Sequence, residues 1–279
     1  MNAPQSPSLV ILGGGVAGVA VAYYAQRLGV PCTLFEKNAW IGGLSRTFQA
    51  GEHFYDSGAH RFHDQYADTT ADVRSLLGDE LRQVRSPSKI YDRGNLIDFP
   101  PTPLNLLGSL SVREIGKACF DLVRARCTIQ NPKSFEEFAI GRFGESLARR
   151  YLIRYTEKLW GLPADELSVD VATRRLSGMS FGTLVKEILA PSRKADHIDG
   201  EFLYPHRGIG RIVDAMAATL PPGSIRKEHE VAKIVCRKGR VNRILFTNGA
   251  EVAPGSRVIS TLPVGRLASL LGDAISPES

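Results

Sequence analysis

Residues 9–36 decide the fold of this chain, and they read LVILGGGVAGVAVAYYAQRLGVPCTLFE. The apolar run at residues 9–12 is typical of a buried strand, and it leads into a G-x-G-x-x-G turn at residues 13–18. A stretch rich in alanine and valine then predicts a helix, and a second apolar run ends at an acid. This order of strand, turn, helix and strand is the β-α-β unit that binds dinucleotides.

The glycines of the turn have separate physical roles. Gly13 permits the tight turn out of the strand, Gly15 lets the backbone approach a pyrophosphate, and Gly18 lets the helix pack close to the sheet. Val16 and Ala17 begin the helix, where N–H groups and the positive end of the helix dipole favour a phosphate. The motif predicts a dinucleotide site at these five residues, but it does not separate NAD from FAD.

The acid at the end of the second strand completes the motif. Glu36 follows Gly18 by 18 residues, close to the ~20 expected for an acid that accepts hydrogen bonds from a ribose diol. Lys37 comes directly after it, and we include both residues in the predicted cofactor site.

A second glycine motif begins six residues after Glu36 and reads GGLSRT. It resembles the G-G-x-x-x-T segment of the FAD-binding superfamily that includes amine oxidases, protoporphyrinogen oxidases, phytoene desaturases and UDP-galactopyranose mutase. Paired glycines bring backbone N–H groups close to a flavin or its phosphates, and Arg46 adds positive charge. The alternative is a simple glycine turn after an edge strand. The spacing favours FAD as the cofactor, bound in part by Gly42, Gly43, Leu44 and Ser45.

Composition excludes several other classes of protein. The 279 residues carry a formal net charge of +6 with a pI near 9.2, which suits an anionic ligand or is simply a solvated basic surface. Neither a nucleic-acid-binding signature nor a signal peptide or spanning helix is evident. Four scattered cysteines predict reduced, mostly buried thiols and a cytoplasmic protein. His60 and His63 lack a third ligand cluster nearby, so we expect no metal site.

The spacing of apolar residues and breakers predicts three segments. Residues 1–100 form the first part of the FAD-binding domain, with short strands around a turn at residues 49–51, a helix from Asp68 to Leu77 and a hairpin at residues 89–99. Residues 101–203 form a mainly helical substrate or cap domain. A capping box at Ser134 begins one of its helices. Residues 204–279 return to the FAD-binding domain, with a helix to about Leu220 and strands at 231–238, 241–247 and 257–263.

Three strings narrow the resemblance to a family. They are residues 55–63, YDSGAHRFH; residues 155–161, YTEKLWG; and residues 202–210, FLYPHRGIG. Together they resemble UDP-galactopyranose mutase and the mutase-like members of the protoporphyrinogen oxidase and amine oxidase group. The resemblance implies an α/β fold, in which a Rossmann-like FAD-binding domain of the GR2 type holds an inserted, mainly helical substrate domain.

The resemblance also implies roles for single residues. Gly58, Ala59 and His60 correspond to a loop near the flavin ring, and Val231 to a strand residue that contacts adenine through its backbone. Tyr155 corresponds to an aromatic residue that stacks on uracil, Trp160 to one near the sugar, and Arg174 to a phosphate-binding arginine. His60, Trp160 and Arg174 are the catalytic candidates, although the flavin itself carries the chemistry. The alternative is that the aromatic pair belongs to a core and that the arginine is solvated.

Members of this family continue well beyond the strand near residues 258–263. Their later part supplies further contacts to FAD and to the substrate, so we expect this chain to be C-terminally truncated relative to the family. It would then be a fragment, a split-gene product or a reduced relative. A second subunit, or a second copy of the chain, could complete the site.

Three functions are compatible with these observations. The first is a flavoenzyme of the mutase type, which changes the ring size of a nucleotide-sugar without net oxidation. The second is an FAD-dependent oxidoreductase that removes hydride from an amine, a porphyrinogen or a polyene. The third is a non-catalytic or split-chain module that binds a nucleotide. A shift of the absorption bands of the bound flavin on addition of UDP would distinguish the mutase function from the other two functions.

Overall fold

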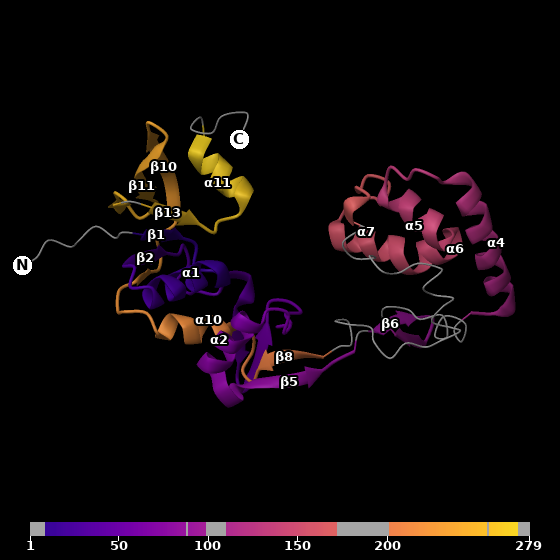
Figure 1. The fold of residues 1–279 in the computed structure, drawn as a ribbon, viewed down its shortest axis with the longest axis horizontal. Coiled ribbons are helices and arrows are strands. Elements are labelled where there is room, and N and C mark those ends of the chain that lie inside the picture. Colours follow the sequence, from indigo (N-terminus) through magenta and orange to yellow (C-terminus); the bar gives the residue numbers. More distant parts are fainter. Residues whose placement is uncertain (1–8, 88, 99–109, 172–200, 256, 273–279) are drawn as a thin grey trace, which may run out of the picture. The chain divides into compact units, whose positions relative to one another are not determined.

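A computed structural model describes residues 9–87, 89–98, 110–171, 201–255 and 257–272 (Figure 1). The chain divides into two compact units. The first, here called the two-segment unit, comprises Met1–Arg85 and Phe202–Ser279; the second, the helical unit, comprises Ser86–Glu201. The chain therefore leaves its first unit, builds the second and returns to the first.

A parallel sheet of four short strands organises the two-segment unit. Its strands, in spatial order, are β13 (Arg257–Ser260), β1 (Leu9–Leu12), β2 (Cys32–Phe35) and β9 (Ile225–Arg226). All three pairings are parallel, and α1 (Val16–Arg27) connects the two central strands. Every residue of β1 is buried, as expected for a parallel strand covered on both faces. The predicted β-α-β unit is confirmed.

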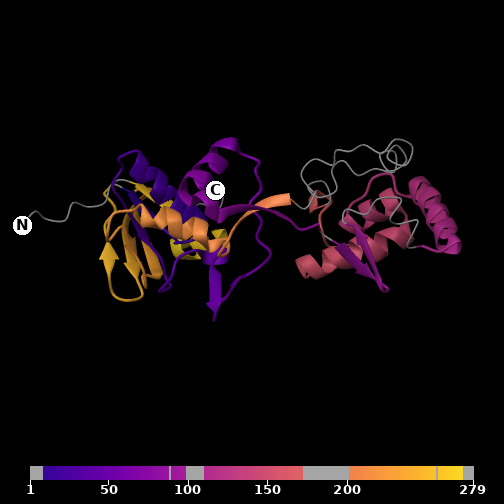
Figure 2. The same ribbon diagram turned by 90° about the horizontal axis from the view of Figure 1, so that it is seen from below.

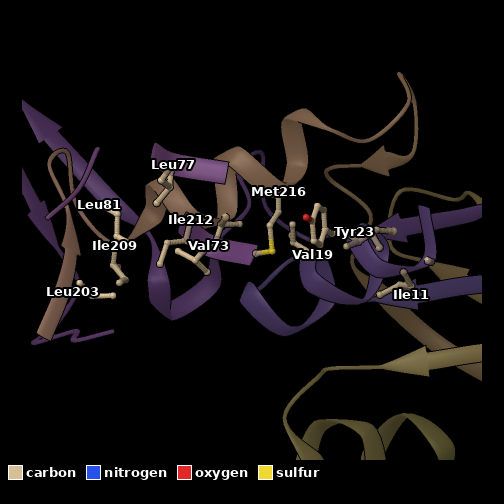
Figure 3. Packing of buried hydrophobic residues seen from close by; sticks show 14 of the residues in the cluster. Ile11, Val19, Tyr23, Val73, Leu77, Leu81, Leu203, Ile209, Ile212 and Met216 are labelled. Atoms are coloured by element: carbon tan, nitrogen blue, oxygen red, sulfur yellow. The ribbon is translucent and has the colours of Figure 1, made fainter. Parts of the chain in front are cut away.

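A layer of helices extends from one face of this sheet. α1 packs on the sheet, α10 (Gly210–Ala218) packs on α1, and α2 (Ala67–Leu77) packs on α10. Figure 3 shows the core between them, with Ile11 of the sheet, Val19 and Tyr23 of α1, Val73 of α2 and Met216 of α10. Because α2 and α10 come from the two separate segments, this core joins the beginning of the chain to its later part.

A second sheet and the last helix cover the other face. These elements are β10 (Val231–Arg237), β11 (Arg240–Phe246), β12 (Glu251–Val252) and α11 (Val264–Leu271). Val10 and Leu12 pack against them with Phe35, Ile244 and Phe246. The β10–β11 hairpin stands out in both views, in orange to yellow (Figures 1 and 2). The strands predicted at 231–238 and 241–247 are therefore present.

Short elements complete the two-segment unit. They are η1 (Gly43–Ser45), β3 (Thr47–Ala50), β4 (His53–Asp56), η2 (Gly78–Glu80), β5 (Leu81–Arg85) and β8 (Glu201–Pro205). The hairpin β3–β4 turns where the sequence predicts it, and β5 pairs with β8. Strand β8 thus brings the returning chain back beside the first segment.

A polar network fastens the β3–β4 hairpin to the start of α10. The Asp56 carboxylate accepts hydrogen bonds from the Thr47 hydroxyl at 2.5 Å, from the Tyr204 hydroxyl and from the Ile209 N–H at 3.2 Å. The Thr47 hydroxyl oxygen in turn accepts the N–H of Gly210 at 2.9 Å. The first N–H groups of α10 therefore find acceptors on a hairpin that is distant in sequence.

The described part of the helical unit contains one hairpin and a succession of helices. They are β6 (Lys89–Asp92), β7 (Asn95–Asp98), α4 (Val112–Thr128), α5 (Phe135–Phe143), α6 (Glu145–Leu147), a π-helical segment η3 (Ala148–Ile153) and α7 (Arg154–Trp160). Ile97 packs on Tyr151, and Arg150 pairs with Asp92. These contacts place the hairpin in the helical unit, so the division falls before Ser86 and not near residue 100.

At the starts of α4 and α5, the capping hydrogen bonds differ from those that the sequence predicts. Ser134 does cap α5, because its hydroxyl accepts the N–H of Glu137 at 3.2 Å. The Glu137 carboxylate, however, accepts the N–H of Lys133 and not that of Ser134. A complete capping box stands instead at the start of α4, where Ser111 and Glu114 bond reciprocally.

The cysteines are less buried than the composition predicts. Cys119 and Cys127 are exposed, whereas Cys32 and Cys236 are partly buried, and all four are free thiols. Burial raises the pKa of the Cys32 thiol. The expectation of mostly buried cysteines is therefore wrong, because α4 turns both of its cysteines outward. None of the described helices has the length and apolarity needed to cross a membrane.

Candidate cofactor-binding site

A cavity of about 640 Å³ opens where the parallel strands end and α1 begins. We call it the dinucleotide cavity. Its walls include most of the predicted cofactor residues, namely Gly13, Gly15, Val16, Ala17, Glu36, Lys37, Gly42, Gly43, Leu44, Ser45 and Val231. This is the edge at which open parallel sheets bind their ligands, because the carboxyl ends of the strands and the helix N-termini meet there.

The three motif glycines are required for different reasons. A Cβ on Gly18 would lie 1.9 Å from the carbonyl oxygen of Gly13, so the helix could not pack where it does. Gly13 has a φ of +103°, and its Cβ would lie 2.7 Å from the Thr261 hydroxyl. A Cβ on Gly15 would meet nothing within 4 Å, and the φ of this residue is −69°. The fold explains Gly13 and Gly18, whereas Gly15 faces open space.

The start of α1 is open towards the cavity. Gly15 is its N-cap and supplies no side chain, and the first turn contains no acid. Val16 is 43% exposed, and the first intrahelical bond of this helix runs from the Val19 N–H to the Gly15 carbonyl. The N–H groups before Val19 therefore have no partner within the helix, and the positive end of the helix dipole favours an anion beside them.

Glu36 is buried at the end of β2 and braces the glycine turn. Its carboxylate accepts the N–H of Gly14 at 2.7 Å, and it also accepts the N–H of Asn38 at 2.9 Å and the side-chain amide of Asn38 at 2.7 Å. A carboxylate has about four lone-pair sites, so the one that remains can accept a ligand hydroxyl. The side chain predicted to bind ribose thus also holds its own binding loop in place.

The second glycine motif forms the opposite wall of the cavity. The N–H of Gly42 donates to the carbonyl of Gly14 at 2.8 Å, and the two motifs run parallel where Gly15 faces Gly42. Gly42 and Gly43 have φ angles of +108° and +55°, which residues with a Cβ rarely adopt. A Cβ on Gly43 would lie 3.1 Å from the Cα of Gly15. Close approach of two backbones explains this glycine pair.

The loop after β4 lies outside the cavity lining but is tied to its wall. Gly58, Ala59 and His60 do not line the cavity, and the His60 N–H bonds to the Gly58 carbonyl at 2.9 Å within the loop. The hydroxyl of Ser57 donates to the carbonyl of Leu44 at 2.6 Å. Ser57 therefore connects the predicted flavin loop to the second glycine motif, a contact that the sequence reading missed.

The returning segment contributes residues that the sequence reading also missed. Thr261 follows β13, and its hydroxyl donates to the carbonyls of Leu12 at 3.0 Å and Gly13 at 3.3 Å. Arg266 of α11 donates to the carbonyl of Val231 at 3.3 Å. His229 packs its ring on Phe35. For Thr261, the available signal was its position near the carboxyl end of the strand predicted at 257–263, where ligands of parallel sheets gather.

The predicted substrate residues belong to the helical unit. Tyr155 and Trp160 lie on α7 and are 52% and 50% exposed, while Thr156 between them is buried. They directly follow the π-helical segment η3, and such segments are frequent at functional sites. The pair therefore does not form part of the core. Arg174 lies outside the described residues.

Comparisons with known proteins agree with this geometry. The profile of the family described as flavin containing amine oxidoreductase matches residues 16–278. A dTDP-fucopyranose mutase of Escherichia coli is 24% identical over 177 residues, which are 60% of this chain and 45% of that protein. A mitochondrial protoporphyrinogen oxidase of Nicotiana tabacum is 29% identical over 104 residues, which are 36% of this chain and 21% of that protein. The chain thus spans less than half of the length of these two relatives.

Solved structures show the same fold. The crystal structure of a reduced UDP-galactopyranose mutase has a TM-score of 0.80 at 24% identity, over 95% of this chain and 57% of that one. A putrescine oxidase bound to putrescine has a TM-score of 0.61 at 18% identity, over 97% of this chain and 60% of that one. These likenesses confirm the predicted α/β fold class.

Proposed function

The chain belongs to the flavin containing amine oxidoreductase family, and from this premise we propose that its two-segment unit binds FAD in the dinucleotide cavity. The observation that carries the proposal is the open space beside Gly15 at the start of α1. Nothing within the fold requires a glycine there, whereas a pyrophosphate that approaches the backbone does.

The residues around the cavity would share the binding of the dinucleotide. The N–H groups of Val16 and Ala17 would bind the pyrophosphate, and the remaining lone pair of Glu36 would accept a ribose hydroxyl. Lys37 adds positive charge, and the backbone of Val231 would contact the adenine. When bound, the flavin supplies the electron pair or hydride chemistry of the family, so the protein binds and orients the reactants.

For the reaction, we favour nucleotide-sugar ring isomerisation of the mutase type. Tyr155 and Trp160 support it, because two large aromatic side chains on one short helix are half exposed. Such rings can stack on a uracil and a sugar. His60, Trp160 and Arg174 stay the candidates for catalysis. A nucleotide-sugar or another small molecule stays the predicted substrate. The cytoplasmic location and a second chain that completes the site also stay predictions.

The alternative reaction is hydride removal by an FAD-dependent oxidoreductase. The similarity to a protoporphyrinogen oxidase over 104 residues supports it. In that case an apolar substrate would bind without any dependence on UDP, and turnover would consume oxygen or another electron acceptor. A chain that binds nucleotide without catalysis is the third reading, and it predicts firm FAD retention only when a second polypeptide is added.

The test is the visible absorption spectrum of the full chain after mixing with FAD and desalting, with and without UDP. Retained flavin bands that shift with UDP support the mutase proposal, and turnover would then be assayed under reducing conditions. Retained bands without a response favour the oxidoreductase. A colourless protein contradicts FAD binding by this chain alone.

Single substitutions distinguish the proposed FAD site from the proposed UDP site. Gly15→Ser should abolish flavin retention, because the new side chain occupies the open space. Tyr155→Ala should weaken UDP binding by about tenfold, as expected for the loss of about 1.4 kcal/mol of stacking, and should leave flavin retention unchanged. Leu162→Ala is the matched control, since Leu162 is a similarly exposed apolar residue just beyond α7. An equal loss of UDP binding in both variants would contradict a specific role for Tyr155.

A further inference from the structure

A second cavity, of about 460 Å³, lies in the two-segment unit, and among the described residues it shares only Gly42 with the dinucleotide cavity. We call it the basic cavity. It lies among the β3–β4 hairpin, the start of α10 and the segment after β9. Residues 42–45 line the dinucleotide cavity, and Gly42 and residues 46–49 line the basic cavity, so Arg46, predicted to add positive charge near the flavin or its phosphates, lines the basic cavity instead. The same stretch of chain therefore forms a wall of both.

Positive charge dominates the lining of the basic cavity. Arg46, Arg207, Arg211 and Lys227 line it, against the single carboxylate of Asp214. Arg211 is already neutralised, because it donates two hydrogen bonds of 3.0 Å to Glu80. The other three cations form no salt bridge in the described part of the chain, although the charge of Arg207 acts on the Glu80 carboxylate from beyond salt-bridge distance. An excess of cations around one hollow favours an anionic ligand.

Aromatic rings hold the guanidinium of Arg46 in place. The guanidinium of Arg46 lies 4.2 Å from the ring centroid of Trp40 and 4.5 Å from that of Phe48. Phe48 stacks in turn on Tyr55 at 5.5 Å. A guanidinium fixed over ring faces keeps its N–H donors at its planar edge, where they match a phosphate or carboxylate. Arg46 is therefore preorganised for an anion without a carboxylate partner.

We propose that the basic cavity is a second ligand site, which binds a phosphorylated small molecule through Arg46, Arg207 and Lys227. A volume of about 460 Å³ is within the usual range of small-molecule sites. Three cations at one hollow suit two adjacent phosphates better than one monovalent group. The proposed site adjoins the predicted FAD site and shares Gly42 with it.

Trp40 gives a direct readout, because it lines the basic cavity and the chain contains two tryptophans. In a Trp160→Phe background, Trp40 is the only tryptophan left in the chain, so the fluorescence comes from the wall of this cavity. The full chain would be titrated with inorganic pyrophosphate, ADP and adenosine. Saturable changes with pyrophosphate and ADP but not with adenosine are expected, since the phosphates supply the binding. Tighter binding of ADP than of pyrophosphate would assign part of the site to the nucleoside.

Two double variants locate the anion. Arg207→Gln with Lys227→Gln removes one arginine and one lysine from the basic cavity and should weaken binding by about tenfold or more. Lys37→Gln with Arg266→Gln removes the same charges from the dinucleotide cavity and should leave the titration unchanged. The proposal is overturned if the second pair abolishes the signal and the first does not, or if neither anion changes the fluorescence. Neither outcome depends on whether FAD binds.

Discussion

The Glu36 carboxylate accepts a hydrogen bond of 2.7 Å from the backbone N–H of Gly14, 22 residues earlier in the chain. This bond joins the end of β2 to the glycine turn that follows β1. It lies at the wall of the dinucleotide cavity, so a residue expected to contact the ligand also stabilises the glycine turn. We therefore expect ligand binding and folding to be coupled at this position.

Replacing Glu36 should lower both stability and flavin retention. In Glu36→Gln, an NH₂ group replaces one of the oxygens that accept the N–H donors of Gly14 and Asn38. We expect a loss of about 1 to 3 kcal/mol of unfolding free energy, because a buried donor is left unsatisfied. Urea unfolding and FAD titration measure the two effects. Glu52→Gln, at an exposed acid, should change neither stability nor flavin retention. Equal effects of the two substitutions would contradict a stabilising role for Glu36.

The motif glycines should separate folding from binding. Gly18→Ala should cost about 3 kcal/mol or more, because its Cβ cannot fit 1.9 Å from the Gly13 carbonyl oxygen without displacing the helix. Gly15→Ser should fold normally, since its Cβ meets open space and serine is a favourable N-cap. Thermal unfolding checks both variants. Strong destabilisation by Gly15→Ser would mean that the fold itself requires this glycine.

Tyr204 should make stability depend on alkaline pH. Burial, and then its hydrogen bond to Asp56, raise the pKa of Tyr204 from 10.0 to about 12. The folded chain holds this proton more tightly than the unfolded chain does, so the stabilisation is complete below pH 10 and is lost as the pH rises through about 12. Tyr204→Phe should lose about 1 kcal/mol at neutral pH and should flatten this alkaline dependence.

Urea unfolding at a series of alkaline pH values measures this effect. Tyr91→Phe is the matched control, because Tyr91 is 74% exposed and its loss should leave the pH dependence intact. The assignment to Tyr204 is wrong if Tyr91→Phe flattens the curve as much as Tyr204→Phe does.

Glu114 should make the helical unit sensitive to acid. Hydrogen bonds from the Ser111 backbone, and then from the Ser111 side chain, lower the pKa of Glu114 from 4.5 to about 2. This contribution is present above pH 4.5 and is lost as the pH falls through about 2. Glu114→Gln should therefore reduce the acid dependence of the melting temperature. Glu166→Gln, at an exposed acid, should not, and an unchanged slope in Glu114→Gln would refute the role of the capping box.

Much of the fold follows from local patterns. The apolar run at residues 9–12 and the glycines at residues 13, 15 and 18 predict β1 and α1, and the turn at residues 49–51 predicts the β3–β4 hairpin. Such features depend on residues close in the chain. The capping box at Ser111, which the sequence analysis missed, and the partial one at Ser134 share the same sequence signature. They differ because the Glu137 carboxylate accepts the N–H of Lys133, whereas the Glu114 carboxylate accepts that of the N-cap Ser111.

The site is harder to derive because its contacts join distant segments. Thr261 bonds to the glycine turn about 250 positions earlier, at a sequence separation of 249 from Leu12. Tyr204 bonds to Asp56 at a separation of 148. No periodicity or spacing within one segment encodes these pairs, since they exist only when the chain has returned from the helical unit.

The sequence by itself determined the β-α-β unit, the two glycine motifs and the family, because each rests on residue types at short, regular spacing. Only the tertiary structure decided that Glu36 braces Gly14, that Ser57 ties its loop to Leu44, and that Arg46, Arg207 and Lys227 line one cavity. Those outcomes depend on which separate segments the core brings together. Hydrophobic burial between α1, α2 and α10 determines that arrangement, and the polar contacts at the cavities follow from it.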